Sequence, residues 1–166
     1  PLPRADWSST TKLAAKRKLA PKLGEALLSL LQSPNITSKE KWVRAYDHEV
    51  QASTHVKPFA GAKADGPSDA GVIWLKPHGG ESGNGVAVAC GMAPRMSLCD
   101  PYRMAQFAVD EAVRNTVVAG GNPDRLCLLD NFCWPDPVAS AKNPHGAYKL
   151  GQLVRTSQGL YDICKA

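Results

Sequence analysis

Two spacings of apolar residues divide the chain into extended and helical parts. Three short segments rich in β-forming residues are separated by Gly, Pro, Ser or Asp, and they are residues 50–59, 70–76 and 84–91. Segments of this kind predict β-strands. From Pro101 to about residue 119 the apolar residues recur at steps of three and four, which predicts a long helix. We predict a further strand over residues 125–132 and a last helix from about Ala147.

The residues before the first strand predict short helices. Residues 24–32 carry leucines at helical spacing, and a Ser-Pro turn then breaks the pattern. Thr37 and Glu40 have the spacing of a capping box, in which two side chains satisfy backbone donors at the start of a helix. The helix that they introduce is predicted to run to about Tyr46.

The order of these elements predicts two regions and an α+β fold. We interpret residues 1–44 as a basic helical lead-in or linker, and residues 45–166 as the main α/β domain. Three or four strands between residues 50 and 131 are expected to form one mixed or antiparallel sheet, with the helix of residues 101–119 on one face. A chain of 166 residues that is 43% hydrophobic is long enough for one core of ordinary size.

The net charge of +5 is concentrated near the start of the chain, because residues 1–44 carry +6 and the remainder carries −1. A basic run in this region consists of Lys12, Lys16, Arg17, Lys18 and Lys22. No aromatic residue is interleaved to stack on bases and no recognised binding module follows, so we expect a solvated helix face. The alternative, a basic module that binds nucleic acid or an acidic partner, predicts affinity that falls steeply with salt.

The cysteines and the ends of the sequence narrow the picture further. The five cysteines show no C-x-x-C pair, which argues against a disulfide framework and a zinc site, and we expect buried or idle thiols. The sequence has neither a secretory leader nor an apolar run of membrane-spanning length, so we expect a cytoplasmic protein without a membrane partner. Because the chain begins with Pro1 and stops inside a predicted helix at Ala166, we expect a piece of a longer protein.

Glu111 and Asn115 are the first candidates for chemistry. They lie four residues apart in the predicted long helix and so project from the same face. One carboxylate and one amide oxygen form a hard, oxygen-only pair, which suits Mg²⁺ better than zinc or copper. On spacing alone, two exposed polar residues that bind nothing are the more common explanation.

Polar residues at strand ends are the other candidates. Asp69 follows Ser68 and directly precedes a predicted strand, where a turn with exposed backbone N–H groups can hold phosphate oxygens while the carboxylate serves a metal. Asp130 lies at the end of the predicted strand 125–132, a common position for site residues. Both aspartates are also common turn formers. The four histidines show no ligand spacing, and the usual phosphate-binding glycine motifs are absent from the sequence.

Four stretches taken together resemble phosphoribosylformylglycinamidine synthase, of the superfamily that also contains aminoimidazole ribonucleotide synthetase. They are SPNITSKEKWVRAYDHEVQ, SDAGVIWLK, GVAVACGMAPRMSLCDPYRMAQFAVDEAVRN and LLDNFCWPDP, and they cover most of residues 33–137 in the right order. The combination of YDHEVQ, DEAVRN and LLDNFCW is specific, whereas any one of them alone would be weak.

The resemblance implies a fold and a reaction. The chain is similar to a helical lead-in plus the N-terminal α/β piece of the second half of the family's synthetase region, whose two related halves pair through their sheets. The implied activity is an ATP-dependent ligase of purine biosynthesis that converts formylglycinamide ribonucleotide to its amidine with glutamine-derived ammonia. The implied partners are this small-molecule substrate, the remaining parts of the synthetase, and a glutaminase domain or subunit.

The resemblance also implies roles for single residues. Asp69, Glu111 and Asn115 fall on the family's magnesium positions for a nucleotide that is often described as auxiliary. Asp130 falls on a position that contacts the reacting ATP in smaller members, and Ser68 stands in the expected phosphate turn. The implied cofactors are therefore Mg²⁺ and ATP or ADP. The family's acid/base histidine belongs to the other half, so no catalytic residue is assigned here.

Another ATP-using member of the superfamily, such as a kinase or a selenophosphate-type synthetase, is the main alternative because it shares the fold. The DNFCW and YDHEVQ stretches favour the synthase. The family's glycine-rich metal loop should begin shortly after Ala166. We therefore expect the isolated chain to be inactive, and to self-associate through its uncovered sheet.

Overall fold

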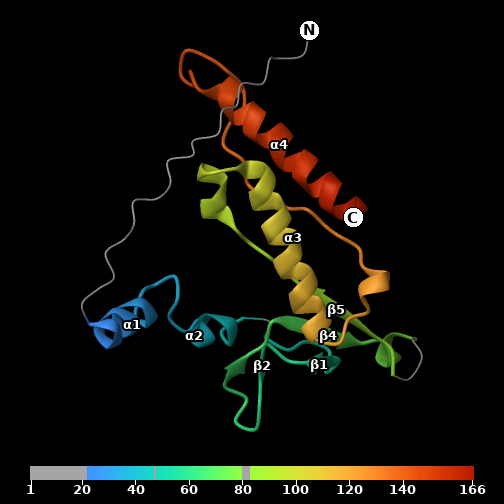
Figure 1. Ribbon diagram of the computed structural model, residues 1–166. Coiled ribbons are helices and arrows are strands. Elements are labelled where there is room, and N and C mark those ends of the chain that lie inside the picture. Colours follow the sequence, from blue (N-terminus) through green and yellow to red (C-terminus); the bar gives the residue numbers. More distant parts are fainter. Residues whose placement is uncertain (1–21, 47, 80–82) are drawn as a thin grey trace.

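The computed structural model describes residues 22–46, 48–79 and 83–166 (Figure 1). Its helices are α1 (Leu23–Leu31), α2 (Glu40–Val43), α3 (Pro101–Val118) and α4 (Gly146–Lys165), with short 3₁₀ helices η1 (Lys76–His78), η2 (Pro94–Leu98) and η3 (Pro123–Arg125). Its strands are β1 (Thr54–Val56), β2 (Phe59–Ala60), β3 (Gly66–Pro67), β4 (Ala70–Trp74) and β5 (Gly85–Ala89). The α+β class expected from the sequence is confirmed.

The strands form two antiparallel sheets. In the larger sheet β4 lies between β1 and β5, with Ala70 opposite Ala89 and Trp74 opposite Gly85. The smaller sheet is the β2–β3 hairpin, whose connection turns at Gly61 with a φ of 87°, a conformation that glycine adopts readily. The strands predicted over residues 70–76 and 84–91 are therefore confirmed as β4 and β5. The strand predicted over residues 50–59 is shorter, since β1 covers only Thr54–Val56 and Phe59 belongs to the hairpin, which the pattern did not reveal.

α3 begins at Pro101, as the sequence predicts, and it lies between the sheet and the last helix (Figure 1). Pro101 occupies its first turn, and the Asp100 side chain accepts a hydrogen bond from the Tyr102 backbone N–H at 3.0 Å. A side-chain acceptor at this position satisfies one of the donors that a helix start leaves unpaired. The helix continues to Val118 and contacts β5 on its way.

α3 also packs closely against α4 (Figure 1). Gly159 of α4 lies so near α3 that an added Cβ would stand 2.4 Å from the Tyr102 carbonyl oxygen and 3.2 Å from the Ala105 Cβ. Ala105 and Thr156 are each only 2% exposed. The Thr156 hydroxyl donates to the Gln152 carbonyl oxygen at 2.9 Å, so it is satisfied although buried. Small residues thus let the two helices approach each other.

The strand predicted over residues 125–132 is wrong. The chain is irregular from Leu126 onward, and Leu129 is 88% exposed. A strand needs a partner for its backbone hydrogen bonds, and in the described sheets this segment pairs with no other strand. Of the expected buried or idle thiols, the buried alternative is wrong, because all five cysteines are exposed, and all five are free, as expected.

The capping box predicted for α2 is wrong as well. The hydroxyl oxygen of Ser38, not Thr37, accepts a hydrogen bond from the Glu40 backbone N–H at 3.2 Å. A serine two residues before an N–H can bond it within a local turn, which competes with the longer-range cap. α2 then ends at Val43 rather than near Tyr46.

Residues 1–21 lie outside the described residues, and they hold most of the basic run. Its last member, Lys22, forms an exposed ion pair with Glu25 at 3.0 Å. The boundary proposed between residues 44 and 45 stays a prediction. Within the described ranges, none of the helices has the length and apolar character needed to cross a membrane.

Replacing Gly159 by alanine tests the close approach of α3 and α4. Alanine favours a helix by about 1 kcal/mol over glycine, but overpacking at a contact without room costs about 1–3 kcal/mol. Because the Tyr102 carbonyl oxygen is backbone, we expect the clash to dominate and the free energy of unfolding in a urea titration to fall. The same exchange at Gly24 of α1, where a Cβ would meet nothing, should be neutral or stabilising. A Gly159→Ala chain as stable as the wild type would contradict this packing.

Candidate magnesium and nucleotide site

Glu111 and Asn115 reach from α3 to the segment that follows β5. Asn115 Nδ2 donates a hydrogen bond to the Cys90 carbonyl oxygen at 3.1 Å. Glu111 Oε2 accepts a hydrogen bond from the Met92 backbone N–H at 2.8 Å. The two side chains therefore lie on the same face of α3, as their spacing predicts, and both hold the backbone of residues 90–92.

Gly91, between these two bonds, lies directly on the surface of α3. An added Cβ would stand 1.9 Å from the Ala108 carbonyl oxygen and 2.8 Å from the Ala112 backbone nitrogen. Neither atom belongs to a side chain that could move aside, so only glycine fits here. Sequence analysis did not single out Gly91, although a lone glycine just after a predicted strand often marks a close backbone approach.

Asp69 lies at the adjacent strand end. It precedes Ala70, which pairs with Ala89, so the start of β4 and residue 90 are at the same end of the sheet. A cavity of about 160 Å³ at this end is lined by Val56, Ser68, Asp69, Ala70, Val118 and Ala119. Val118 and Ala119 belong to the last turn of α3, just beyond Asn115. Asp69 therefore lies at the end of the sheet that the C-terminal half of α3 approaches, and Glu111 and Asn115 contact the segment after β5 at that same end.

Ser68 and Asp130 have different surroundings. The Ser68 backbone N–H donates to the Pro58 carbonyl oxygen at 2.9 Å, which continues the pairing of the β2–β3 hairpin, so this N–H is not open to a phosphate oxygen. Asp130 is exposed in the irregular segment after η3. Within the part of the chain that the structure describes, no hydrogen bond or ion pair ties Asp130 to the cluster on α3. Its nucleotide contact stays a prediction.

The donor atoms suit a hard cation. Asp69 and Glu111 supply carboxylates and Asn115 an amide oxygen, a set that Mg²⁺ accepts when water or phosphate oxygens complete its shell. Among the described residues, no cluster of three or more His, Cys, Asp or Glu side chains could hold a metal. Two carboxylates and one amide would supply only part of a cation's shell, which a nucleotide's phosphates could complete.

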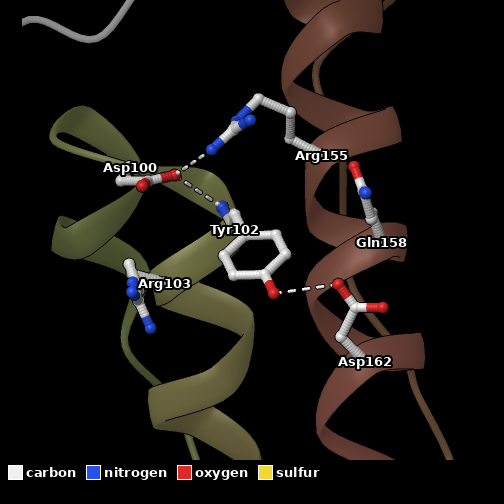
Figure 2. Close-up of a pocket in the computed structure, with 6 residues that line it drawn as sticks. All are labelled: Asp100, Tyr102, Arg103, Arg155, Gln158 and Asp162. Atoms are coloured by element: carbon white, nitrogen blue, oxygen red, sulfur yellow. Dashed lines mark hydrogen bonds and ion pairs between the residues drawn. The ribbon is translucent and has the colours of Figure 1, made fainter.

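A larger, polar cleft of about 330 Å³ lies elsewhere, between the start of α3 and α4 (Figure 2). Arg155 Nη2 is 3.2 Å from Asp100 Oδ1, and the Tyr102 hydroxyl donates to Asp162 Oδ2 at 2.8 Å. The remaining lining residues are Arg103 and Gln158. Because the Asp100–Arg155 and Tyr102–Asp162 contacts cross it, this cleft joins the two helices, and it contains none of the predicted site residues.

The Tyr102–Asp162 pair also changes a titration. The hydrogen bond to Asp162, then burial, then the negative charge of Asp162 raise the pKa of Tyr102, because each favours the neutral phenol. On the outer side of α3, the hydrogen bond from Arg114, at 2.8 Å, lowers the pKa of Asp110. The sequence pattern did not reveal that Tyr102 and Asp162 form a hydrogen bond, because 60 residues separate them.

The fold is that of a small α+β domain, and Asp69, Glu111 and Asn115 offer it oxygen donors of the kind that a hard cation accepts. Residues 67–166 match the family described as AIR synthase related protein, N-terminal domain. The chain belongs to this family. No solved structure matches it.

The chain is also similar to curated proteins named phosphoribosylformylglycinamidine synthase subunit PurL. It is 39% identical over 148 residues to the one from Prochlorococcus marinus strain MIT 9303, 37% over 144 residues to that of Deinococcus radiodurans, and 36% over 149 residues to that of Gloeobacter violaceus. These matches cover 84–87% of the chain. The chain spans only about 16–17% of the length of these relatives.

Removing the Asp162 side chain tests the joint between α3 and α4. In Asp162→Ala we expect the pKa of Tyr102 to fall toward the usual tyrosine value of about 10, measured from the ¹³Cζ chemical shift during a pH titration. Because the folded-state pKa is raised, the pair contributes stability that is present below about pH 10 and is lost as pH rises through that pKa.

Asp110→Ala is the matched control, since Asp110 is an aspartate of α3 whose side chain pairs with Arg114 instead of Tyr102. It should leave the Tyr102 titration unchanged. An unchanged Tyr102 midpoint in Asp162→Ala would show that the hydrogen bond is not formed in solution.

Proposed function

We propose that the chain is the N-terminal α/β piece of the second half of the synthetase region of a phosphoribosylformylglycinamidine synthase. The observation that carries this proposal is the 36–39% identity, over most of the chain, to proteins of that name. A kinase or selenophosphate-type synthetase shares the fold class but is less favoured, since the relatives given above bear the synthase name. The cytoplasmic location expected from the sequence stays a prediction.

The proposed reaction of the whole enzyme converts formylglycinamide ribonucleotide, ATP and ammonia to formylglycinamidine ribonucleotide, ADP and phosphate. Transfer of the γ-phosphoryl group to the amide oxygen turns that oxygen into a good leaving group. Ammonia then forms the new C–N bond as phosphate leaves. The ammonia is supplied by glutamine hydrolysis in a glutaminase domain or subunit, which is the partner that we propose.

In this proposal Asp69, Glu111 and Asn115 hold Mg²⁺, and Ser68 and Asp130 contact the nucleotide. The bound Mg²⁺ would neutralise phosphate charge. The donor chemistry fits, because the Cys90 carbonyl oxygen can only accept a hydrogen bond and Asn115 must turn its NH₂ group toward it. The amide oxygen of Asn115 is then the atom left for a cation.

An assay of the intact parent protein tests the activity. Supplied with formylglycinamide ribonucleotide, ATP and ammonia, it should form the amidine and release ADP and phosphate in equal amounts. ATP consumption with a different acceptor and no amidine would favour the kinase or selenophosphate-type alternative.

Glu111→Ala in the intact enzyme tests the cation site. Removing one of two carboxylates takes away much of the electrostatic attraction for Mg²⁺, so we expect Mg-nucleotide affinity to fall about tenfold or more in titration calorimetry. The loss of the Met92 bond should also cost stability of about 1 kcal/mol. Asp110→Ala, which removes the adjacent carboxylate on the outer side of α3, is the control. Unchanged binding by folded Glu111→Ala would refute the assignment.

We also propose that the isolated chain has no turnover and associates with itself. The larger sheet and its edges expose apolar side chains, among them Ile73, Val86 and Val88, which are 43%, 46% and 60% exposed. Apolar surface beside open strand edges tends to find a partner, and a second copy would form the simplest closed pair. Light scattering at rising concentration should report a mass above the monomer. A persistent monomer, or amidine formation by this chain alone, would contradict the proposal.

A further inference from the structure

Residues 90–92, the hook segment, contact α3 through one carbonyl and one N–H, which lie on either side of Gly91. The Cys90 carbonyl oxygen accepts from Asn115 Nδ2, and the Met92 N–H donates to Glu111 Oε2. A carbonyl can only accept and an N–H can only donate, so each bond engages one specific kind of atom on the side chain that it meets. The hook segment thereby imposes an orientation on both side chains at once.

The atoms that the hook segment leaves unengaged are both oxygens. With its NH₂ group on Cys90, Asn115 keeps its Oδ1 for another contact. With Oε2 on the Met92 N–H, Glu111 keeps its Oε1. Two oxygens from side chains four residues apart are then held away from the hook segment on one helix face. A hard cation requires oxygen donors, and an Asn115 turned the other way would offer it N–H groups instead.

Gly91 makes both of these hydrogen bonds possible. Both bonds need the hook backbone to lie against α3, and a Cβ at residue 91 would stand 1.9 Å from the Ala108 carbonyl oxygen. Any larger residue would lift the segment off the helix and lengthen both hydrogen bonds together. Gly71 of β4, in the same sheet, has no such neighbour, since a Cβ there would meet nothing within 4 Å.

We propose that the hook segment is the outer shell of the cation site, and that Gly91 and the Met92 N–H are positioning groups that orient Glu111 and Asn115. This inference rests on the cation site of the proposed function and deepens it. Groups that orient metal ligands without touching the metal affect its affinity, because free side chains must otherwise be ordered when the ion binds. A purely structural hook would affect stability and leave the affinity of the folded chain unchanged.

The sharpest test removes a single N–H. Met92→Pro removes the backbone N–H that donates to Glu111, whereas Met92→Ala keeps it. Because Met92 is 76% exposed, little packing is lost in either variant. Mn²⁺, a spectroscopic stand-in with the same preference for oxygen ligands, is titrated into the full 166-residue chain and followed by electron paramagnetic resonance. We expect Met92→Pro to bind Mn²⁺ about tenfold more weakly than the wild type does, and Met92→Ala to bind it with the affinity of the wild type.

A second pair of variants tests Gly91. Gly91→Ala should weaken Mn²⁺ binding to a similar extent, and Gly71→Ala should not. Thermal unfolding of the metal-free chains separates orientation from stability, since a variant that is folded at the temperature of the titration is compared on affinity alone. If Gly91→Ala does not fold, the Met92 pair still decides the question.

The outcomes also separate this inference from the cation site itself. A wild-type chain that binds no Mn²⁺ would overturn both. If the wild type binds Mn²⁺ and Glu111→Gln loses it, while Met92→Pro and Gly91→Ala bind as the wild type does, the cation site stands and the positioning role is wrong. Weaker binding in both hook variants, with both controls unchanged, supports the proposal.

Discussion

The contact of the hook segment with α3 is the constraint on which the candidate site depends. Gly91 lets the backbone leave β5 and touch the helix, with the Ala108 carbonyl oxygen directly beneath it. Glu111 and Asn115 then fasten the segment on both sides of this contact. Since β5 pairs with β4, whatever fixes the end of β5 on α3 also fixes the start of β4, where Asp69 lies. One close approach thus sets the relative positions of three side chains from two parts of the sequence.

The other end of α3 is held by α4. Gly159 allows the backbone of α4 to approach Tyr102, and the Arg155–Asp100 and Tyr102–Asp162 contacts close the adjoining cleft (Figure 2). α3 is therefore held at its start by a second helix and near its end by the sheet. A helix held at both ends is a rigid support, which matters because cation ligands must keep their geometry within a small tolerance.

Much of the apolar surface of the described residues remains exposed. Val88 of β5 and the leucines of α1 are more than half exposed, whereas the buried hydrophobic core consists of Phe59, Ala70, Ala105 and Val109. Contiguous exposed apolar surface is typical of interaction sites. This distribution agrees with a role in which other parts of a synthetase cover the sheet and the lead-in helices, as the proposed function requires.

The sequence by itself determined the elements that depend on local spacing. The run of apolar residues from Pro101 predicts α3, β-branched residues predict β4 and β5, and the four-residue step puts Glu111 and Asn115 on one face. Pairing was not determined in this way, because a strand exists only beside another strand. The segment 125–132 has strand-like residues but pairs with no described strand, and its residues from Leu126 on are irregular.

Tertiary structure alone decided what the site residues meet. Antiparallel register places Asp69 at the end of the sheet where residue 90 lies, and the contact at Gly91 gives Glu111 and Asn115 their hydrogen-bond partners. Side-chain spacing within one helix follows from the 3.6-residue turn. The atom that each side chain faces follows from packing between segments that are distant in sequence. A local sequence pattern does not show which distant segments will pack together.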